Sequence, residues 1–226
     1  MTVVYCFSGT GHSRAVARYM AEKLGTPVRE IGKDIPIPSD VAVIVFPVYC
    51  QNIPAPVKAV LPQITAKHVA LIATYGKMGC GNVLWESAKL VKGQVIAGAY
   101  VPTGHTYLEE GTEFDTDPLQ TLLERIRDPK PVLLPRRKKW WLADVLPDGR
   151  SRLSVELERT RDCTQCGLCT RDCPMGTMEN GRPGKNCIRC LRCVKICPAQ
   201  AIRVSYGRVL RAYLRKPKQN EWIFYV

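Results

Sequence analysis

Eight of the eleven cysteines follow one spacing pattern that occurs twice in the C-terminal half of the chain. The first run is Cys163-x2-Cys166-x2-Cys169-x3-Cys173-Pro174, and the second is Cys187-x2-Cys190-x2-Cys193-x3-Cys197-Pro198. Two residues between cysteines let three thiolates turn toward one centre, and each proline directs the chain away from it. The pattern therefore predicts a small unit that folds around bound metal.

Zinc sites and disulfides are the alternative interpretations of these cysteines. Zinc sites usually show two C-x-x-C pairs, without a third cysteine two residues further on. Disulfide frameworks belong to short secreted chains, whereas Met1 to Phe7 has no basic n-region and is too short for a signal-peptide core. The spacing favours iron–sulfur clusters in a reducing, anaerobic cytoplasm.

The two runs resemble those of bacterial-type ferredoxins, which hold two [4Fe–4S] clusters. The resemblance implies a crossed assignment, because the fourth cysteine of each run binds the cluster of the other run. One cluster is then held by Cys163, Cys166, Cys169 and Cys197, and the other by Cys187, Cys190, Cys193 and Cys173.

The net charge of +13 is unevenly distributed. Residues 1–128 contain twelve Lys or Arg and twelve Asp or Glu, whereas residues 129–226 contain twenty-one and eight. Two clusters offset about four of these positive charges. The sequence has no nucleic-acid-binding motif and no apolar run long enough for a membrane span. We therefore expect an acidic redox protein as partner.

Residues 1–128 alternate strand-like and helix-like segments. The expected strands are Thr2–Phe7, Val28–Ile31, Val41–Phe46, His68–Thr74 and Gln94–Val101. The expected helices are Ser13–Leu24, Pro56–Leu61, Asn82–Val91 and Pro118–Arg127, the last with Asp117 as its N-cap. This alternation predicts the α/β class, with helices on both faces of a five-stranded parallel sheet.

A segment rich in glycine and hydroxyl groups connects the first strand to the first helix. Its residues are Ser8, Gly9, Thr10, Gly11, His12 and Ser13. Glycines permit a tight turn, hydroxyls donate hydrogen bonds, and the helix start directs N–H groups toward the loop. Ordinary capping is the alternative, but the placement after a strand favours a phosphate site. The Walker A and dinucleotide patterns are both missing.

This loop resembles the phosphate loop of flavodoxins, Thr/Ser-x-Thr-Gly-x-Thr/Ser, at all four defined positions. The resemblance implies FMN, the doubly wound strand order 2-1-3-4-5, and a flavin ring between the loops after the third and fourth strands. It makes Tyr49 the ring-stacking residue and places the backbone of Asn52, Tyr75 and Gly76 near the ring edge. A plain core role for Tyr49 is the alternative.

The whole chain resembles ferredoxins that carry an N-terminal flavodoxin-like domain fused to a two-cluster domain. The resemblance covers 1–128, as a flavodoxin-like domain, and 158–204, as a small α+β bacterial ferredoxin domain. The residues themselves predict a basic and aromatic linker at 129–157, and an extension at 205–226 whose apolar end docks on the protein. The linker segment Arg136–Trp141 either packs its tryptophans between domains or forms a partner-docking patch.

The remaining cysteines and histidines are weaker candidates. Cys6 is expected to be a core residue. Cys50 and Cys80 lie in the predicted flavin loops, where they are inert thiols, a disulfide pair, or groups that react at the flavin. His105, which follows the fifth strand, and Tyr107 are candidate proton donors, with a simple loop role for His105 as the alternative.

Two functions are consistent with this pattern. The first is an electron carrier, which needs no catalytic acid or base and stabilises one-electron-reduced flavin. The second is an FMN-dependent reductase of a quinone, an enone or another flavin, fed by its own clusters. The long segment Pro102–Asp117 is typical of an active-site lid and favours the reductase. A redox sensor is a third hypothesis. The sequence is also compatible with a homodimer.

Overall fold

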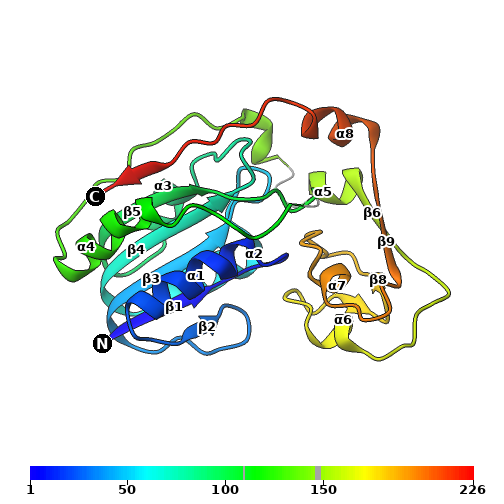
Figure 1. The fold of residues 1–226 in the computed structure, drawn as a ribbon, viewed down its shortest axis with the longest axis horizontal. Helices are drawn as coiled ribbons and strands as arrows, with labels where there is room; N and C mark the ends of the chain where they lie inside the picture. Colours follow the sequence, from blue (N-terminus) through cyan, green and yellow to red (C-terminus); the bar gives the residue numbers. More distant parts are fainter. Residues whose placement is uncertain (109, 146–148) are drawn as a thin grey trace.

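The computed structural model describes residues 1–108, 110–145 and 149–226. Its main body is a six-stranded sheet in the order β10-β5-β4-β3-β1-β2, and a smaller unit lies beside the sheet (Figure 1). The sheet strands are β1 (Thr2–Cys6), β2 (Val28–Glu30), β3 (Ser39–Pro47), β4 (Ala66–Tyr75), β5 (Gln94–Pro102) and β10 (Ile223–Tyr225). The long segment 102–117 and the linker 129–157 include Glu109 and residues 146–148, which lie outside the described residues.

The first five strands are parallel and take the order 2-1-3-4-5. β3 and β4 lie in the middle, and residues 41–47 and 69–75 are buried without interruption. A central parallel strand is covered on both faces, so it needs a continuous apolar run rather than an alternating one. The structure confirms the mixed α/β class and the strand positions.

Helices cover both faces of the sheet. One face packs against α1 (His12–Lys23) and α4 (Gln120–Arg127). The other face packs against α2 (Ala55–Val60), the 3-10 helix η1 (Leu61–Gln63) and α3 (Val83–Ala88). Because all crossovers lie on these faces, the loops that follow the strands gather at the carboxyl edge of the sheet.

The sheet has a sixth strand that the sequence patterns did not predict. β10 pairs antiparallel with β5, with Phe224 opposite Ala99. Ile223 and Tyr225 pack on one face of the sheet, while Trp222 and Phe224 pack on the other. The apolar C-terminal residues therefore cover the exposed edge of β5, which would otherwise present unpaired backbone groups.

The entry into α4 differs from the expectation. Asp117 is the first residue of the 3-10 helix η2 (Asp117–Leu119) and does not cap α4. Its own N–H donates to the carboxylate of Asp115 at 3.1 Å. The side chain that accepts the local backbone hydrogen bond thus lies two residues earlier, in an Asx-type turn.

The smaller unit consists of short elements around the eight motif cysteines. β6 (Val155–Arg159) pairs antiparallel with β9 (Ile202–Tyr206), and β7 (Met178–Glu179) pairs with β8 (Arg182–Pro183). Its other elements are α5 (Gly149–Ser154), α6 (Leu168–Arg171), α7 (Arg192–Lys195) and α8 (Arg208–Leu214), while the 3-10 helix η3 (Trp141–Ala143) lies in the linker before it. From α8 the chain returns to the sheet as β10 (Figure 1). Within the described parts of the chain, none of the helices combines the length and apolar character required to cross a bilayer.

Candidate functional site

The loop between β1 and α1 forms a tight turn at the start of the helix. Gly11 has φ of 106°, a conformation that favours glycine, and it is the N-cap of α1. Its N–H donates to the hydroxyl of Ser8 at 3.1 Å. The hydroxyl of Ser13 is buried and lies 2.7 Å from that of Thr74 at the end of β4. The turn is therefore tied to the carboxyl edge of the sheet.

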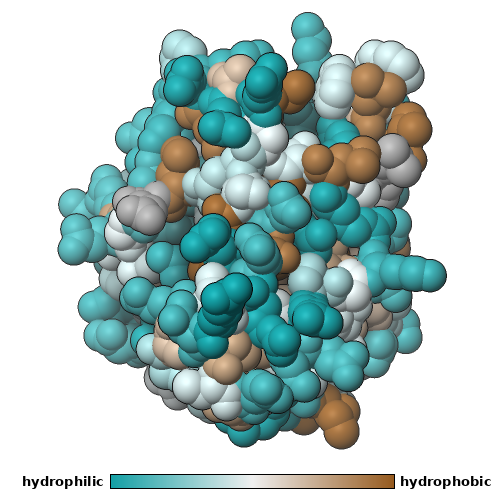
Figure 2. All heavy atoms as spheres, turned by 90° about the vertical axis from the view of Figure 1, so that its right-hand side faces the viewer, coloured by the Kyte–Doolittle hydropathy of each residue, from teal (hydrophilic) through white to brown (hydrophobic). Residues whose placement is uncertain are grey.

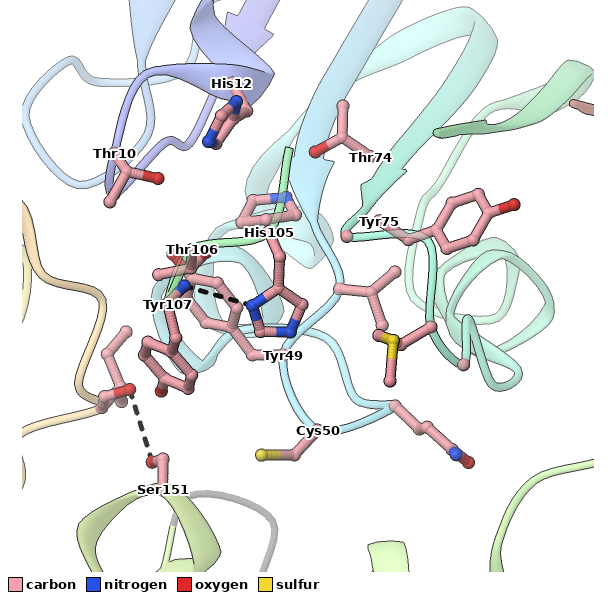
Figure 3. Close-up of a pocket in the computed structure, with 18 of the residues that line it drawn as sticks. Thr10, His12, Tyr49, Cys50, Thr74, Tyr75, His105, Thr106, Tyr107 and Ser151 are labelled. Atoms are coloured by element: carbon pink, nitrogen blue, oxygen red, sulfur yellow. Dashed lines mark hydrogen bonds between the residues drawn. The ribbon is translucent and has the colours of Figure 1, made fainter. Parts of the chain in front are cut away.

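A cavity of about 400 Å³ lies against this turn. It is bounded on the sheet side by the loops after β1, β3, β4 and β5, and on the other side by α5, α8 and the segment near Ile188 (Figure 3). Of the predicted flavin-site residues, the ones that line it are Ser8, Gly9, Thr10, His12, Ser13, Tyr49, Tyr75 and Gly76, and both His105 and Tyr107 line it as well. A cavity of this volume is typical of a small-molecule cofactor site.

Asn52 and Gly11 do not line the cavity among the residues described. The Asn52 side chain is buried and donates to the carbonyls of Cys50, at 3.1 Å, and Ala143, at 2.9 Å. Backbone hydrogen bonds in both directions join Asn52 and Tyr49, and Cys50 and Gln51 both have positive φ, of 51° and 65°. Asn52 thus holds the tight turn that presents Tyr49 and Cys50 to the cavity.

Tyr49 contributes to the cavity wall and also packs against the core. Its ring is half-buried and meets Phe7 edge-on, with ring centroids 6.3 Å apart. Burial, together with the nearby Cys190, raises the pKa of Tyr49 well above its ordinary value. The phenol is therefore neutral, and a stacking role and a core role remain compatible with its position.

His105 and Tyr107 lie together at the cavity (Figure 3). Burial lowers the pKa of His105 to about 4, so its imidazole is neutral at pH 7. Its Nδ1 accepts the Tyr107 N–H at 3.1 Å, which leaves the ring hydrogen on Nε2. Burial raises the pKa of Tyr107 well above the ordinary value. Both side chains are consequently neutral hydrogen-bond donors.

Two glycines make room for the histidines at this site. A Cβ on Gly76 would lie 2.5 Å from the His105 ring, and one on Gly104 would lie 2.4 Å from the His12 ring. His12 is 7% exposed, and burial lowers its pKa. Its Nδ1 is buried without a hydrogen-bond partner. An unpaired polar atom beside the phosphate-type loop fits a ligand that supplies a polar partner.

The cavity also has a wall that the sequence analysis missed. Arg150 lines it, and it is the only Lys, Arg, Asp or Glu among the described lining residues. Its guanidinium donates to the Cys50 carbonyl at 2.6 Å and lies over the Trp140 ring, 5.0 Å from the centroid. A cation without an acidic neighbour in the lining favours an anionic ligand. The basic character of the linker was the one available sequence signal.

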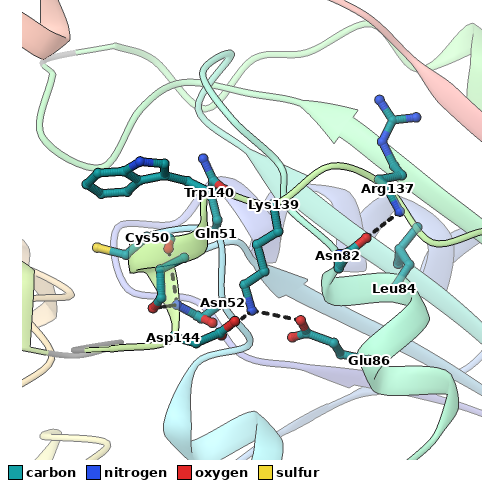
Figure 4. Close-up of polar contacts among 12 residues, drawn as sticks. Cys50, Gln51, Asn52, Asn82, Leu84, Glu86, Arg137, Lys139, Trp140 and Asp144 are labelled. Carbon is teal, nitrogen blue, oxygen red and sulfur yellow. Dashed lines mark hydrogen bonds and ion pairs between the residues drawn. The ribbon is translucent and has the colours of Figure 1, made fainter.

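The linker is tied to the sheet by polar contacts (Figure 4). Lys139 is largely buried and forms ion pairs with Glu86 at 2.7 Å and Asp144 at 2.6 Å. The Trp140 N–H donates to the Gln51 side chain at 2.9 Å. Trp141 is 74% exposed, so the expectation that both tryptophans pack between domains is wrong for Trp141.

The first set of motif cysteines surrounds a small cavity of about 20 Å³. Cys163, Cys166, Cys169 and Cys197 all line it, and the Cys197 thiol accepts the Ala201 N–H at 3.3 Å. Three of these cysteines come from one run and the fourth from the other. This donor set fits the crossed ligand assignment for a [4Fe–4S] cluster.

The second set lies deeper. Cys187, Cys190 and Cys193 are buried, and Cys173 packs in the same apolar cluster as Cys187 and Cys193. Burial, together with neighbouring thiols, raises the pKa of Cys190 to about 11 and that of Cys193 to about 12. Thiols in such surroundings become thiolates when a metal binds them. Among the described residues, no three or more His, Cys, Asp or Glu side chains converge on a single-ion site.

The remaining cysteines are not joined by disulfides. Cys6 is 3% exposed, and burial raises its pKa to about 12, which confirms it as a core residue. Cys50 lines the large cavity, whereas Cys80 packs against the core of the sheet domain. Burial raises the pKa of Cys80, so its thiol is protonated.

The second cysteine set touches the loop after β1. A Cβ on Gly9 would lie 2.3 Å from the Cys190 carbonyl oxygen and 3.0 Å from the Cys190 Cβ. The buried Arg192 donates to the Ser8 carbonyl at 2.6 Å and forms an ion pair with Glu30 at 2.5 Å. The second cysteine set and the large cavity are therefore adjacent within one chain.

Comparisons with known proteins support the iron–sulfur interpretation. The family model described as a 4Fe-4S binding domain matches residues 161–176 and 185–206, so this part of the chain is a 4Fe–4S binding domain. The comparison with curated proteins gave no match. A solved structure described as a putative flavoprotein from Bacteroides uniformis is 16% identical and covers 54% of this chain and 97% of its own, with a TM-score of 0.39. A likeness of that extent carries no functional argument.

Proposed function

We propose that this chain transfers electrons between a redox partner and FMN through two [4Fe–4S] clusters. The 4Fe–4S binding domain makes the role a redox one. The observation that carries the proposal is the contact between Cys190 and Gly9, because it brings an iron–sulfur ligand to the turn that fits the FMN phosphate. Short separations favour electron transfer within the chain over a diffusive encounter.

The residues suggest an order along the path. The set that contains Cys190 lies next to the cavity, whereas the other set includes Cys166, which is exposed. Arg161 and Arg171 are exposed near that outer set, and such cations attract an acidic surface. The proposed path runs from an acidic redox protein to the outer cluster, then to the inner cluster, and then to FMN.

Different cavity residues would contact the phosphate and the ring of the cofactor. The turn at Ser8–Ser13 and the His12 imidazole would hold the phosphate, and Tyr49 and Gly76 would border the ring. Bound FMN supplies chemistry in steps of one or two electrons. Arg150 favours negative charge in the cavity, while the neutral His105 and Tyr107 donate hydrogen bonds without adding charge.

A reductase is the second candidate, and the position of His105 and Tyr107 favours it. Both donors line the same cavity as the phosphate-type turn, so each could give a proton to a small substrate such as a quinone or an enone. Bound FMN would supply the hydride and Tyr107 would supply the proton; two electrons from the clusters, with one proton from solvent to the flavin and one to Tyr107, would restore the starting state.

The test is a stepwise reductive titration of anaerobically reconstituted protein, followed by absorption and EPR. We expect one FMN and about eight iron atoms per chain, with a flavin radical during the titration. Cys190→Ser should lower the iron content to about four, while Cys80→Ser, a half-buried cysteine outside both sets, should leave it unchanged.

Each outcome decides between the proposals. A flavin that passes directly to its two-electron form would favour the reductase over the carrier. A chain that takes up iron but binds no FMN after careful reconstitution would overturn the flavin part of the proposal. Equal iron loss in both cysteine variants would overturn the assignment of the inner cluster.

A further inference from the structure

Large apolar side chains stand exposed around the open side of the cavity. Leu153 is 81% exposed, Val209 is 83% exposed and Trp140 is 48% exposed, and all three line the cavity. Trp141 and Val145, which are 74% and 61% exposed, follow Trp140 in the chain. Apolar atoms gather in the upper part of the face shown in Figure 2, the side that carries α5 and α8. Exposed apolar groups in such number mark an interaction surface.

Cations accompany these side chains, and acidic residues are nearly absent from the described parts of this surface; Asp148, between two of its segments, lies outside the described residues. We call residues 136–145, 149–154 and 208–216 the mouth segments. They contain ten Lys or Arg residues and one acidic residue, Asp144, which is paired with Lys139. Arg152, Arg208 and Arg211 are exposed. The surface around the mouth therefore combines projecting apolar groups with a positive potential.

α8 shows this combination within one short helix. Val209, Leu210 and Tyr213 line the cavity, Arg208 and Arg211 are exposed, and the other two positions of the helix are Ala212 and the buried Leu214; Arg215 follows as the C-cap. At the start of the helix, the N–H of Arg211 donates to the carbonyl of the N-cap residue Gly207 at 3.0 Å. An amphipathic basic helix with apolar projections is typical of proteins that lie on a membrane surface.

We propose that the mouth segments dock this protein on an anionic lipid surface. Anionic headgroups would pair with the exposed arginines, and Leu153, Val209 and Trp141 would enter the interfacial layer. Docking in this way turns the open side of the cavity toward the lipid. The surface reaches beyond the electron-transfer function and does not depend on which cofactor occupies the cavity.

Two other occupants fit less well. A second copy in a two-fold dimer would bring this basic surface against itself, which costs like-charge repulsion. An acidic protein would match the charge, but it would have to receive several separate projections, each more than 60% exposed, from three chain segments. A fluid interface accepts such side chains at any spacing.

The test is co-sedimentation of the reconstituted holoprotein with lipid vesicles. One set contains phosphatidylcholine alone, and the other contains about one-third phosphatidylglycerol. We expect sedimentation with the anionic vesicles at about 0.05 M salt, much less at about 0.5 M salt, and a blue shift of tryptophan fluorescence on binding.

A matched pair of double variants separates the mouth from general surface effects. Leu153→Glu with Val209→Glu should lower binding by at least about tenfold, because it removes two inserted groups and adds two negative charges. Ile35→Glu with Leu133→Glu makes the same charge change at residues 80% and 94% exposed that do not line the cavity, and it should bind nearly as the unaltered protein does.

Several results would overturn the proposal. Equal sedimentation with both vesicle types, or equal loss of binding in both double variants, would show that the mouth does not recognise anionic lipid. A protein that binds no vesicles and self-associates through Leu153 and Val209 would assign the surface to a second copy. Iron and flavin contents are measured in every variant, so a failure of cofactor binding is recognised separately.

Discussion

At the scale of single residues, burial sets the chemistry of the cavity more than charge does. His105 and Tyr107 are held neutral by burial, and His12 shares this tendency. Desolvation disfavours an imidazolium or a phenolate because neither can be hydrated there. The guanidinium of Arg150 donates to the Cys50 carbonyl and brings a positive charge to the cavity, and none of the described lining residues is acidic.

The depressed pKa of His105 predicts a pH dependence of stability. The folded value is about 4, whereas an unfolded histidine titrates near 6.5, so the unfolded chain takes up a proton first as the pH falls. The contribution is fully present above pH 6.5 and is lost as the pH falls from 6.5 to 4. Between pH 7.5 and 5.5 this one group should cost about 1.4 kcal/mol of unfolding free energy.

Urea denaturation of the protein and of His105→Gln at several pH values checks this. The unaltered protein should lose more stability on acidification than the variant does, because the glutamine has no proton to bind. Parallel pH profiles for the two proteins would contradict a neutral, buried His105. The chemical shift of the His105 ring, followed by NMR between pH 5 and 8, should stay constant.

At the scale of elements, the C-terminal segment closes one side of the site. The Tyr75 hydroxyl donates to the carbonyl of Glu221 at 2.6 Å and accepts the Glu221 N–H at 3.1 Å. Lys218 pairs with Glu110, whose carboxylate also accepts the His105 N–H at 2.8 Å. The segment therefore connects β10 to two loops that border the cavity, and it restrains them on that side.

Tyr75→Phe should loosen this C-terminal segment and speed the release of FMN by about fivefold to tenfold, because the segment loses its hydrogen bonds to the Tyr75 hydroxyl. Release is measured as recovery of free-flavin fluorescence after dilution. Tyr5→Phe is the matched control, since the Tyr5 hydroxyl likewise donates to the Ile37 carbonyl at 2.9 Å and accepts its N–H at 3.0 Å, away from the cavity. Equal release rates in the two variants would refute a role for the C-terminal segment in holding FMN.

At the scale of the whole molecule, one buried arginine joins the two cofactor regions. Arg192 is 6% exposed and lies between two motif cysteines. Its contacts with the Ser8 carbonyl and Glu30 cross from the 4Fe–4S binding domain to the sheet. A buried charge that loses its partner is costly, so this contact selects one relative arrangement of the two parts.

Arg192→Gln should therefore lower the unfolding free energy by about 2–4 kcal/mol and separate the loss of cluster absorbance from the loss of flavin binding. Lys33→Gln is the control, because Lys33 also joins the two parts, through Asp172 at 2.5 Å, but is 43% exposed. That exposed pair should contribute less than about 1 kcal/mol. Denaturation curves recorded anaerobically by both signals check the prediction, and equal costs in the two variants would argue against it.

Local patterns in the sequence were sufficient for the five parallel strands, for the helices that connect them, and for the three closely spaced cysteines of each run. The run at residues 41–46 indicates a buried strand because side-chain periodicity follows from the local backbone. The spacing of Cys163, Cys166 and Cys169 brings three thiols together within one short segment, and the resemblance to bacterial-type ferredoxins supplied Cys197 as the fourth. The effects of Pro198 and Gly11 are local in the same way, because proline fixes its own φ and glycine permits a positive φ.

Features that depend on distant segments could not be obtained in this way. β10 was missed because a three-residue strand has too short an apolar pattern and forms only where the edge of β5 is available. The backbone of Asn52 was expected near the flavin ring, but Asn52 is absent from the described cavity lining, and its side chain donates to two carbonyls that the fold brings to it. The sequence analysis did not predict that Arg150 lines the cavity, because local periodicity does not indicate which helix will cover the end of a sheet.

The sequence by itself determined the α/β class of the first half and the iron–sulfur chemistry of the second. Only the tertiary structure decided that the two meet, with Arg192 bonded to Ser8 across 184 positions of the chain. It also decided that the basic linker and α8 surround the same cavity. The physical reason is range: hydrogen-bond geometry and metal-ligand spacing are local, whereas the docking of two units depends on the shape and charge of both surfaces together.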